Sequence, residues 1–107
     1  MTAMRYSEFW LRYLRAHRDP RTRAVHYAGT TLTVACLIAA IVLRDWRFLV
    51  LAPILGYGAA WISHFGIEHN KPETFGHPLW SLASDFRMYG LFLVGRLRPH
   101  LQRAGIA

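Results

Sequence analysis

The sequence has only one cysteine and lacks the short motifs that mark several enzyme classes. Cys36 has no second cysteine to pair with, so an intrachain disulfide is impossible and a packing role is the default. No glycine-rich phosphate loop, Gly-x-Ser-x-Gly elbow or paired-cysteine motif is present. Nucleotide chemistry and the usual covalent hydrolases therefore have no support in the sequence.

Two long stretches contain no Asp, Glu, Lys or Arg, namely residues 24–43 and 48–67. Each is about 20 residues long, which at about 1.5 Å per helical residue matches the ~30 Å hydrocarbon thickness of a bilayer. We therefore predict an all-α integral membrane protein built on a transmembrane helical hairpin. The spans are expected at residues 24–43 and 48–68, and Gly56 and Gly58 would allow close contact between them.

Two other interpretations of the apolar stretches remain open. The first stretch could be a signal peptide, although it follows 23 residues rich in arginine and aromatics and is longer than a usual signal core. Alternatively, the two stretches could form the buried core of a soluble protein. A chain of 107 residues, however, leaves little protein to cover two such helices.

The formal net charge of +7 lies mostly outside the apolar stretches. A basic chain invites a nucleic-acid interpretation, but six arginines precede residue 24 and three follow residue 95, so they flank the membrane segments. Such flanking charge is typical of cytoplasmic segments. We expect no nucleic-acid partner and both termini on the cytoplasmic side, in a bacterial cytoplasmic membrane or, in a eukaryote, the endoplasmic reticulum.

Shorter helices are expected on either side of the hairpin. Residues 4–17 place apolar side chains at the i, i+3, i+4, i+7 spacing, which is typical of an amphipathic interfacial helix, with Ser7 as a candidate N-cap. After a polar loop at residues 69–78, a last helix is expected at residues 79–95. Asp85 and Arg87 would make a membrane crossing costly, so this C-terminal helix is predicted to be interfacial or oblique.

Histidines are the most informative polar residues. His26 and His64 lie at about the same distance from the hairpin turn, ~28–29 Å along their helices, so both are expected at one depth. Glu68 follows His64 by four residues and so shares its face in an α-helix. His17 ends the apolar stripe of the N-terminal helix and points toward the membrane. Imidazoles from three elements are thus directed to one zone.

Imidazole and carboxylate groups suit a non-haem iron site with positions left open for oxygen and substrate. The candidate metal ligands are His17, His26, His64 and Glu68, with His69 and His77 as further candidates. Asp85 and Asn70 are candidates for orienting these ligands. Zinc would accept the same ligand types, and two antiparallel spanning helices could instead hold a haem between their histidines.

Two groups of residues resemble the paired motifs of a known family. They are Phe9-Trp10, Tyr13-Leu14, His17, Pro20, His26 and Gly29-Thr30, and then His64, Glu68, Asn70, Pro72 and Phe75. Together they resemble the Mpo-like 2-hydroxy fatty acid dioxygenases over about residues 6 to 90. The resemblance implies an all-helical membrane enzyme that uses Fe(II) and dioxygen to shorten a 2-hydroxy fatty acid by one carbon through α-oxidation.

The resemblance also implies that His17, His26 and His64 lie at the iron, with Glu68 as the acidic residue after the third histidine. A fatty acid whose carboxylate lies at headgroup level would present its first carbons at this depth. Three basic residues could pair with that carboxylate, namely Arg21, Arg23 and Lys71. The alternatives are a small haem protein and a noncatalytic membrane scaffold, and a homo-oligomer is compatible with each.

Overall fold

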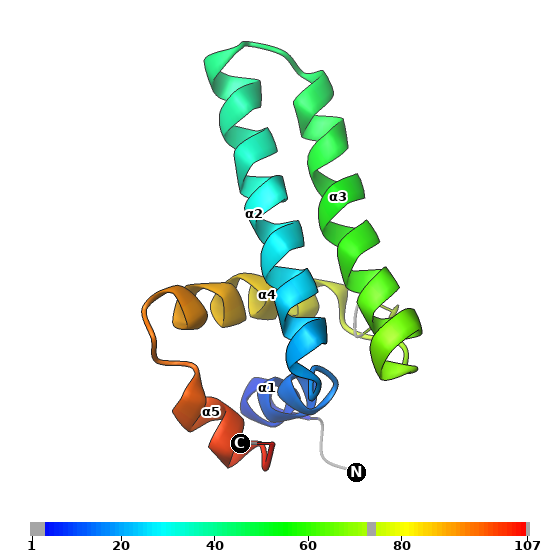
Figure 1. Ribbon diagram of the computed structural model, residues 1–107, viewed down its shortest axis with the longest axis vertical. Coiled ribbons are helices and arrows are strands. Elements are labelled where there is room, and N and C mark those ends of the chain that lie inside the picture. The colour runs from blue at the N-terminus through cyan, green and yellow to red at the C-terminus, as the bar shows by residue number, and fades with distance from the viewer. Residues whose placement is uncertain (1–3, 73–74, 107) are drawn as a thin grey trace.

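The computed structural model describes residues 4–72 and 75–106 of the protein. Glu73 and Thr74 of the predicted polar loop lie outside the described residues. The described parts of the chain form helices and contain no strand. Figure 1 shows two long helices side by side as a hairpin, which stands on a base made of the shorter helices.

Helix α1 spans Tyr6–Arg15 and belongs to the base. Ser7 does not cap it, because the N-cap position is held by Arg5, without a side-chain hydrogen bond. Its buried side chains are Phe9, Trp10, Tyr13 and Leu14. This apolar face agrees with the predicted stripe, but here it is covered by the protein itself. Met88 and Leu97 from the C-terminal half pack against it.

Helices α2 (Pro20–Val42) and α3 (Arg47–Ser63) form the hairpin, and a π-helical turn, η1 (His64–Glu68), continues α3. Asp19 caps α2 by accepting a 2.8 Å hydrogen bond from the backbone N–H of Arg21, and Pro20 occupies the first turn, where no N–H is needed. Helix α2 therefore begins four residues before the predicted span.

Small residues bring the two long helices into close contact. A Cβ added to Gly29 would lie 2.6 Å from Cβ of Ala59, and one added to Gly56 would lie 2.5 Å from Oγ1 of Thr33. The Thr33 hydroxyl donates to the carbonyl of Ala52 across the interface at 3.0 Å. Gly58, by contrast, faces open space, so its predicted role in this contact is wrong.

The outer surface of the hairpin is apolar and uncovered. Helix α2 has 23 residues and α3 with η1 has 22, each long and apolar enough to cross a membrane. Only 17% of the apolar window of α2 and 22% of that of the second helix are buried. Ile41, Val42 and Ile62 are each at least 70% exposed. The hairpin is therefore not the buried core of this chain.

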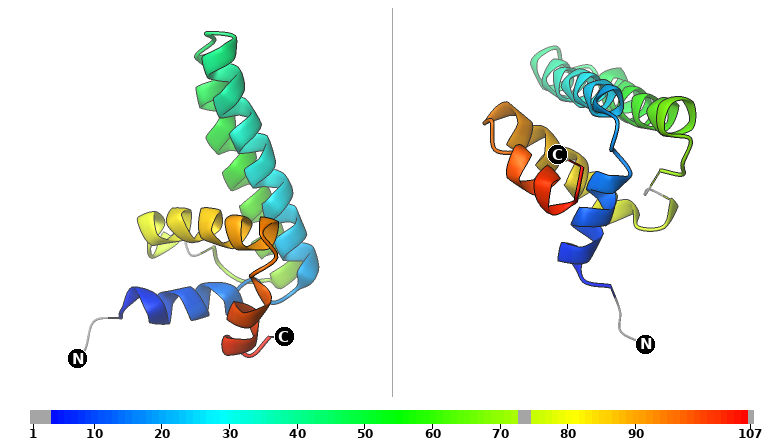
Figure 2. Two further views of the ribbon diagram at one scale, coloured as in Figure 1. Left: turned by 90° about the vertical axis from the view of Figure 1, so that its left-hand side faces the viewer. Right: turned by 60° about the horizontal axis from the view of Figure 1, so that its bottom comes forward.

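Helices α4 (Pro78–Leu93) and α5 (Arg98–Arg103) complete the base. Figure 2 shows α4 lying across the foot of the hairpin, with α1 beneath it, and the contacts of α4 are with α2 and α1. Gly95 allows the turn after α4, since its φ of 72° is in the left-handed region. Helix α5, which the sequence analysis did not predict, places Leu101 against the apolar face of α1.

Gly29→Val is expected to destabilise the hairpin, because its side chain would overlap Ala59. We expect a loss of about 1–3 kcal/mol, as for other overpacked contacts, measured by thermal unfolding in detergent micelles. Gly58→Val is the matched control, because it adds the same side chain to a helix where nothing lies within 4 Å. Equal destabilisation by the two variants would contradict this account of the contact.

Candidate metal centre

Three buried histidines converge where the hairpin meets the base. His17 lies in the link between α1 and α2, His26 in the second turn of α2, and His64 at the start of η1. The Nε2 atom of His17 is 3.1 Å from Nε2 of His26 and 3.1 Å from Nε2 of His64. One nitrogen from each ring lies within 4.8 Å of the other two, so the group could hold a metal ion.

The opposite ring nitrogens face oxygen atoms. Nδ1 of His17 donates to the carbonyl of Tyr13 at 2.6 Å, and Nδ1 of His64 donates to Oδ1 of Asn70 at 2.7 Å. Nδ1 of His26 is 3.7 Å from the carboxylate of Asp85. Because carbonyl and amide oxygens only accept, the protons of His17 and His64 are placed on Nδ1, and the Nε2 atom of each of these two rings presents a lone pair.

The spacing of the Nε2 atoms suits a shared cation. Two imidazole nitrogens bound to one metal at about 2.1 Å, with the bonds near a right angle, lie about 3.0 Å apart. The two distances of 3.1 Å agree with this value. Without a cation, unprotonated nitrogens at this distance would turn their lone pairs toward one another. The donor set therefore fits a metal held by three histidines.

The electrostatic setting keeps His17 neutral. Burial lowers its pKa well below the usual value, and the neighbouring His26 and His64 lower it further. The neutral imidazole is the form that binds metal. The guanidinium of Arg23 donates to the carbonyl oxygens of His17 at 2.7 Å and Arg18 at 2.9 Å, and so stabilises the link that carries this ring.

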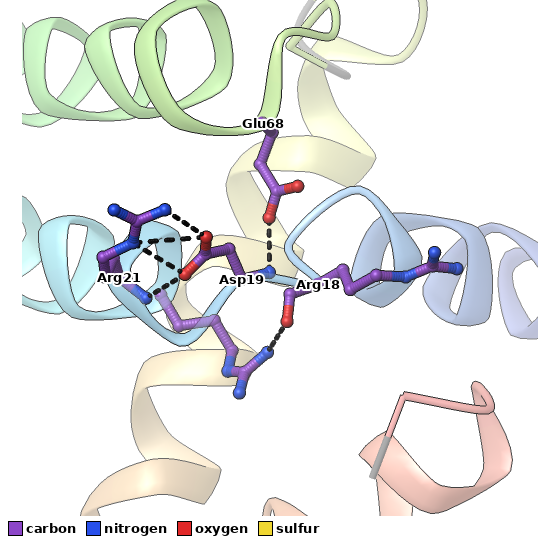
Figure 3. A network of polar contacts seen from close by, with 5 residues as sticks. Arg18, Asp19, Arg21 and Glu68 are labelled. Atoms are coloured by element: carbon purple, nitrogen blue, oxygen red, sulfur yellow. Dashed lines mark hydrogen bonds and ion pairs between the residues drawn. The ribbon is translucent and has the colours of Figure 1, made fainter.

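The structure does not bring Glu68 into the histidine group. The π turn changes the angular spacing after His64, so a residue four positions on no longer has the α-helical relation assumed from the sequence. Oε1 of Glu68 instead accepts the backbone N–H of Asp19 at 2.5 Å (Figure 3). Glu68 thereby links the end of the second long helix to the start of the first.

The two other candidate histidines lie apart from the centre. His69 is exposed and ends η1 in a left-handed conformation with φ of 58°. His77 precedes α4 and stacks on Trp80, with ring centroids 5.2 Å apart. Their positions suit a helix end and an aromatic cluster, respectively.

Asn70 and Asp85 lie next to the histidines, as their predicted orienting role requires. Asn70 also donates through Nδ2 to the carbonyl of Ala16 at 3.2 Å, which fixes Oδ1 toward His64. Burial raises the pKa of Asp85 to about 7, although a hydrogen bond from the Tyr13 hydroxyl acts in the opposite direction. Arg21, Arg23 and Lys71, the three residues predicted to bind a substrate carboxylate, lie outside the histidine group.

Arg21 forms an ion pair with Asp19 at 2.8 Å, as Figure 3 shows. Arg23 is engaged by the two backbone carbonyls of the His17 link. Lys71 is exposed and lines a separate depression with Arg12 and Phe75. The two arginines thus have partners within the protein, and neither is directed into the histidine group by these contacts.

Two further buried residues, Tyr13 and Thr22, were given no role at the site by the sequence. Tyr13 is fully buried, and its hydroxyl donates to Asp85; burial and this carboxylate raise its pKa well above the usual value, so it stays a donor. Thr22 is also fully buried, one helical turn before His26, and its hydroxyl has no hydrogen-bond partner among the described residues. Tyr13 precedes His17 by four positions, so both lie on one helix face, and this spacing is the feature of the sequence that could have indicated that Tyr13 lies near the site.

A family model described as 2-hydroxy-palmitic acid dioxygenase Mpo1-like matches residues 3–97. The chain belongs to this family. The match includes all three histidines of the centre and every helix except α5. Comparison with curated proteins and with solved structures gives no match. Membership of the Mpo1-like family, which is named as a dioxygenase, supports an enzyme.

Alanine in place of His17, His26 or His64 is expected to abolish stable metal binding, because each removes one of the three converging nitrogens. Elemental analysis of detergent-purified protein after dialysis would measure this. His69→Ala is the control, since this exposed residue lies outside the group. A His69→Ala variant that loses as much metal as the other three would contradict the assignment.

Asn70→Ala is expected to weaken metal affinity about 10- to 100-fold, the usual effect of removing the partner that orients a ligating histidine. Asn70→Asp keeps an oxygen acceptor for Nδ1 of His64 and should retain most of the affinity. Competition with a chelator of known affinity gives both values. Equal loss in the two variants would show that Asn70 does not act through His64.

Proposed function

We propose that the protein is an Fe(II)-dependent membrane dioxygenase that shortens 2-hydroxy fatty acids by one carbon through α-oxidation. The observation that carries the proposal is the group of three buried imidazoles whose Nε2 atoms face a common centre. The description of the family, 2-hydroxy-palmitic acid dioxygenase, supports both the reaction type and the class of substrate.

The donor set supports a catalytic rather than a purely structural metal. Three protein ligands leave coordination positions open, whereas structural zinc sites are usually closed by four. Bound Fe(II) would supply the redox chemistry with dioxygen that zinc lacks. The haem alternative fits less well, because axial histidines lie on opposite faces of a porphyrin. Here the rings of His26 and His64 are 5.3 Å apart, and His17 lies beside both.

The residues around the centre would hold the ligands and keep water out. The three histidines are no more than 5% exposed. Tyr13 and Asp85 support His26 from one side, and Asn70 supports His64 from the other.

The apolar hairpin supports a location in a lipid bilayer, with the base and both termini on the cytoplasmic side. The uncovered side chains of α2 and α3 would face hydrocarbon, and the histidine centre would lie near the cytoplasmic headgroups. Basic residues in the base, including Arg12, Arg15 and Arg98, agree with this orientation. A fatty acid would then reach the centre without leaving the membrane.

Iron-loaded protein is expected to consume dioxygen with 2-hydroxypalmitate and to release the acid one carbon shorter. The balance closes with one dioxygen per acid, with carbon dioxide and water as the other products and no external reductant. An oxygen electrode and mass spectrometry would follow both. Zinc-loaded protein and His64→Ala should be inactive. Metal-loaded wild-type protein that consumes no dioxygen with this acid would contradict the proposal.

A further inference from the structure

A cavity of about 290 Å³ runs from the histidine centre along the hairpin. Helices α2, α3 and α4 all contribute to its wall, and His26 and Asp85 line it where it meets the centre. The size is near the lower end for ligand pockets, ~300–1,000 Å³, so it suits a slender ligand that is only partly enclosed. We call this cavity the acyl groove, and its use rests on the function proposed above.

The groove follows one face of α2. Its lining residues on this helix are His26, Thr30, Thr33 and Leu37, at spacings of four, three and four positions that keep them on one side. Eleven residues at about 1.5 Å each give a length of ~16 Å. An extended peptide backbone advances about 3.5 Å for every three bonds, and by the same measure this length corresponds to roughly fourteen bonds of an acyl chain.

The chemistry of the wall changes along this length. An imidazole and a carboxyl group, those of His26 and Asp85, occur at the end next to the histidine centre, whereas Leu37, Ala52 and Pro53 line the other end. A molecule with a polar head and a long apolar tail would match this order when its head lies at the centre. A 2-hydroxy fatty acid has this form.

The side of the groove is open toward the apolar surroundings of the hairpin. Leu37, Leu82 and Phe86 line it and are 39%, 41% and 42% exposed. The same surface continues onto uncovered side chains of α2 and α3, such as Ile38 and Ile54. A chain could therefore enter sideways from lipid while its head moves along the foot of the hairpin to the histidines.

We propose that the acyl groove holds the tail of the substrate and that Leu37, at its far end, limits the length of chain that fits. The groove is continuous with the histidine centre, so a 2-hydroxy acid whose tail lies in the groove has its head beside His26. This continuity is the reason for choosing the substrate tail as the occupant. Thr30 lies one turn from His26 and borders the first carbons, and Leu37 borders the last enclosed ones.

Leu37→Trp should shift the preference toward shorter acids. The larger ring fills the far end, so turnover of a 16-carbon 2-hydroxy acid relative to a 10-carbon one should fall about tenfold. Leu32→Trp is the matched control, because Leu32 is 49% exposed on α2 and does not line the groove. An unchanged chain-length profile in Leu37→Trp, with active wild-type protein, would overturn the role of Leu37.

A second measurement uses wild-type protein without metal and needs no turnover. A 16-carbon 2-hydroxy acid with a diazirine at its far end is irradiated with the protein in micelles, and labelled peptides are mapped by mass spectrometry. Labels at Leu37, Ala52 or Pro53 that unlabelled 2-hydroxypalmitate suppresses would support the groove. Labels confined to residues outside the groove, or labels that unlabelled acid does not suppress, would overturn it.

The two measurements separate this inference from the proposed function. If the diazirine acid labels the groove specifically but the protein oxidises no 2-hydroxy acid, the binding site is supported and the proposed reaction is contradicted. If the protein oxidises the acids but is labelled only outside the groove, the reaction is supported and the binding site is contradicted. Circular dichroism of Leu37→Trp and Leu32→Trp verifies that both variants keep their helices before their profiles are compared.

Discussion

Three imidazoles with their Nε2 atoms turned toward one another form the constraint on which the rest of this structure depends. When His17 and His64 each carry their proton on Nδ1, their two Nε2 lone pairs face each other across 3.1 Å, which is electrostatically costly. Each ring is nevertheless held in place from behind. His17 is bound by the Tyr13 carbonyl and His64 by Asn70, while His26 faces Asp85. A cation at the centre would convert this arrangement from a cost into a source of stability, since metal binding is linked to the folded state.

The hairpin and the base differ in their surfaces and packing, and they meet at the histidine centre. The hairpin presents an apolar surface that little of the chain covers, whereas the base packs the N-terminal helix against α4 and α5. Two sets of noncovalent contacts hold the hairpin and the base together. Glu68 binds the backbone of Asp19, and the base carries Tyr13 and Asp85 to the side of His26. A site at such a boundary suits a substrate with a polar head and an apolar tail, because each part meets a matching environment.

Much of this arrangement could be predicted because it follows from local regularities. Charge-free stretches of helical length located the hairpin, and counting residues from its turn placed His26 and His64 at one depth, where their rings are 5.3 Å apart. The prediction for Glu68 assumed an unbroken α-helix, and the π turn removed that assumption. Helix α5 is only six residues long and depends on packing against α1, which local pattern does not reveal. The hydrogen bond between Tyr13 and Asp85 joins residues 72 positions apart, so spacing along the chain could not indicate it.

The central claim is that one metal ion is bound by three histidines at the foot of the hairpin. X-ray absorption at the iron edge of the iron-loaded, detergent-purified protein tests it most directly, because the fine structure reports the number and type of ligands. The account predicts three imidazole nitrogens at about 2.1 Å from the iron, with oxygen or nitrogen atoms as the remaining ligands. A spectrum with fewer than three imidazoles, or with sulfur bound to the metal, would contradict it.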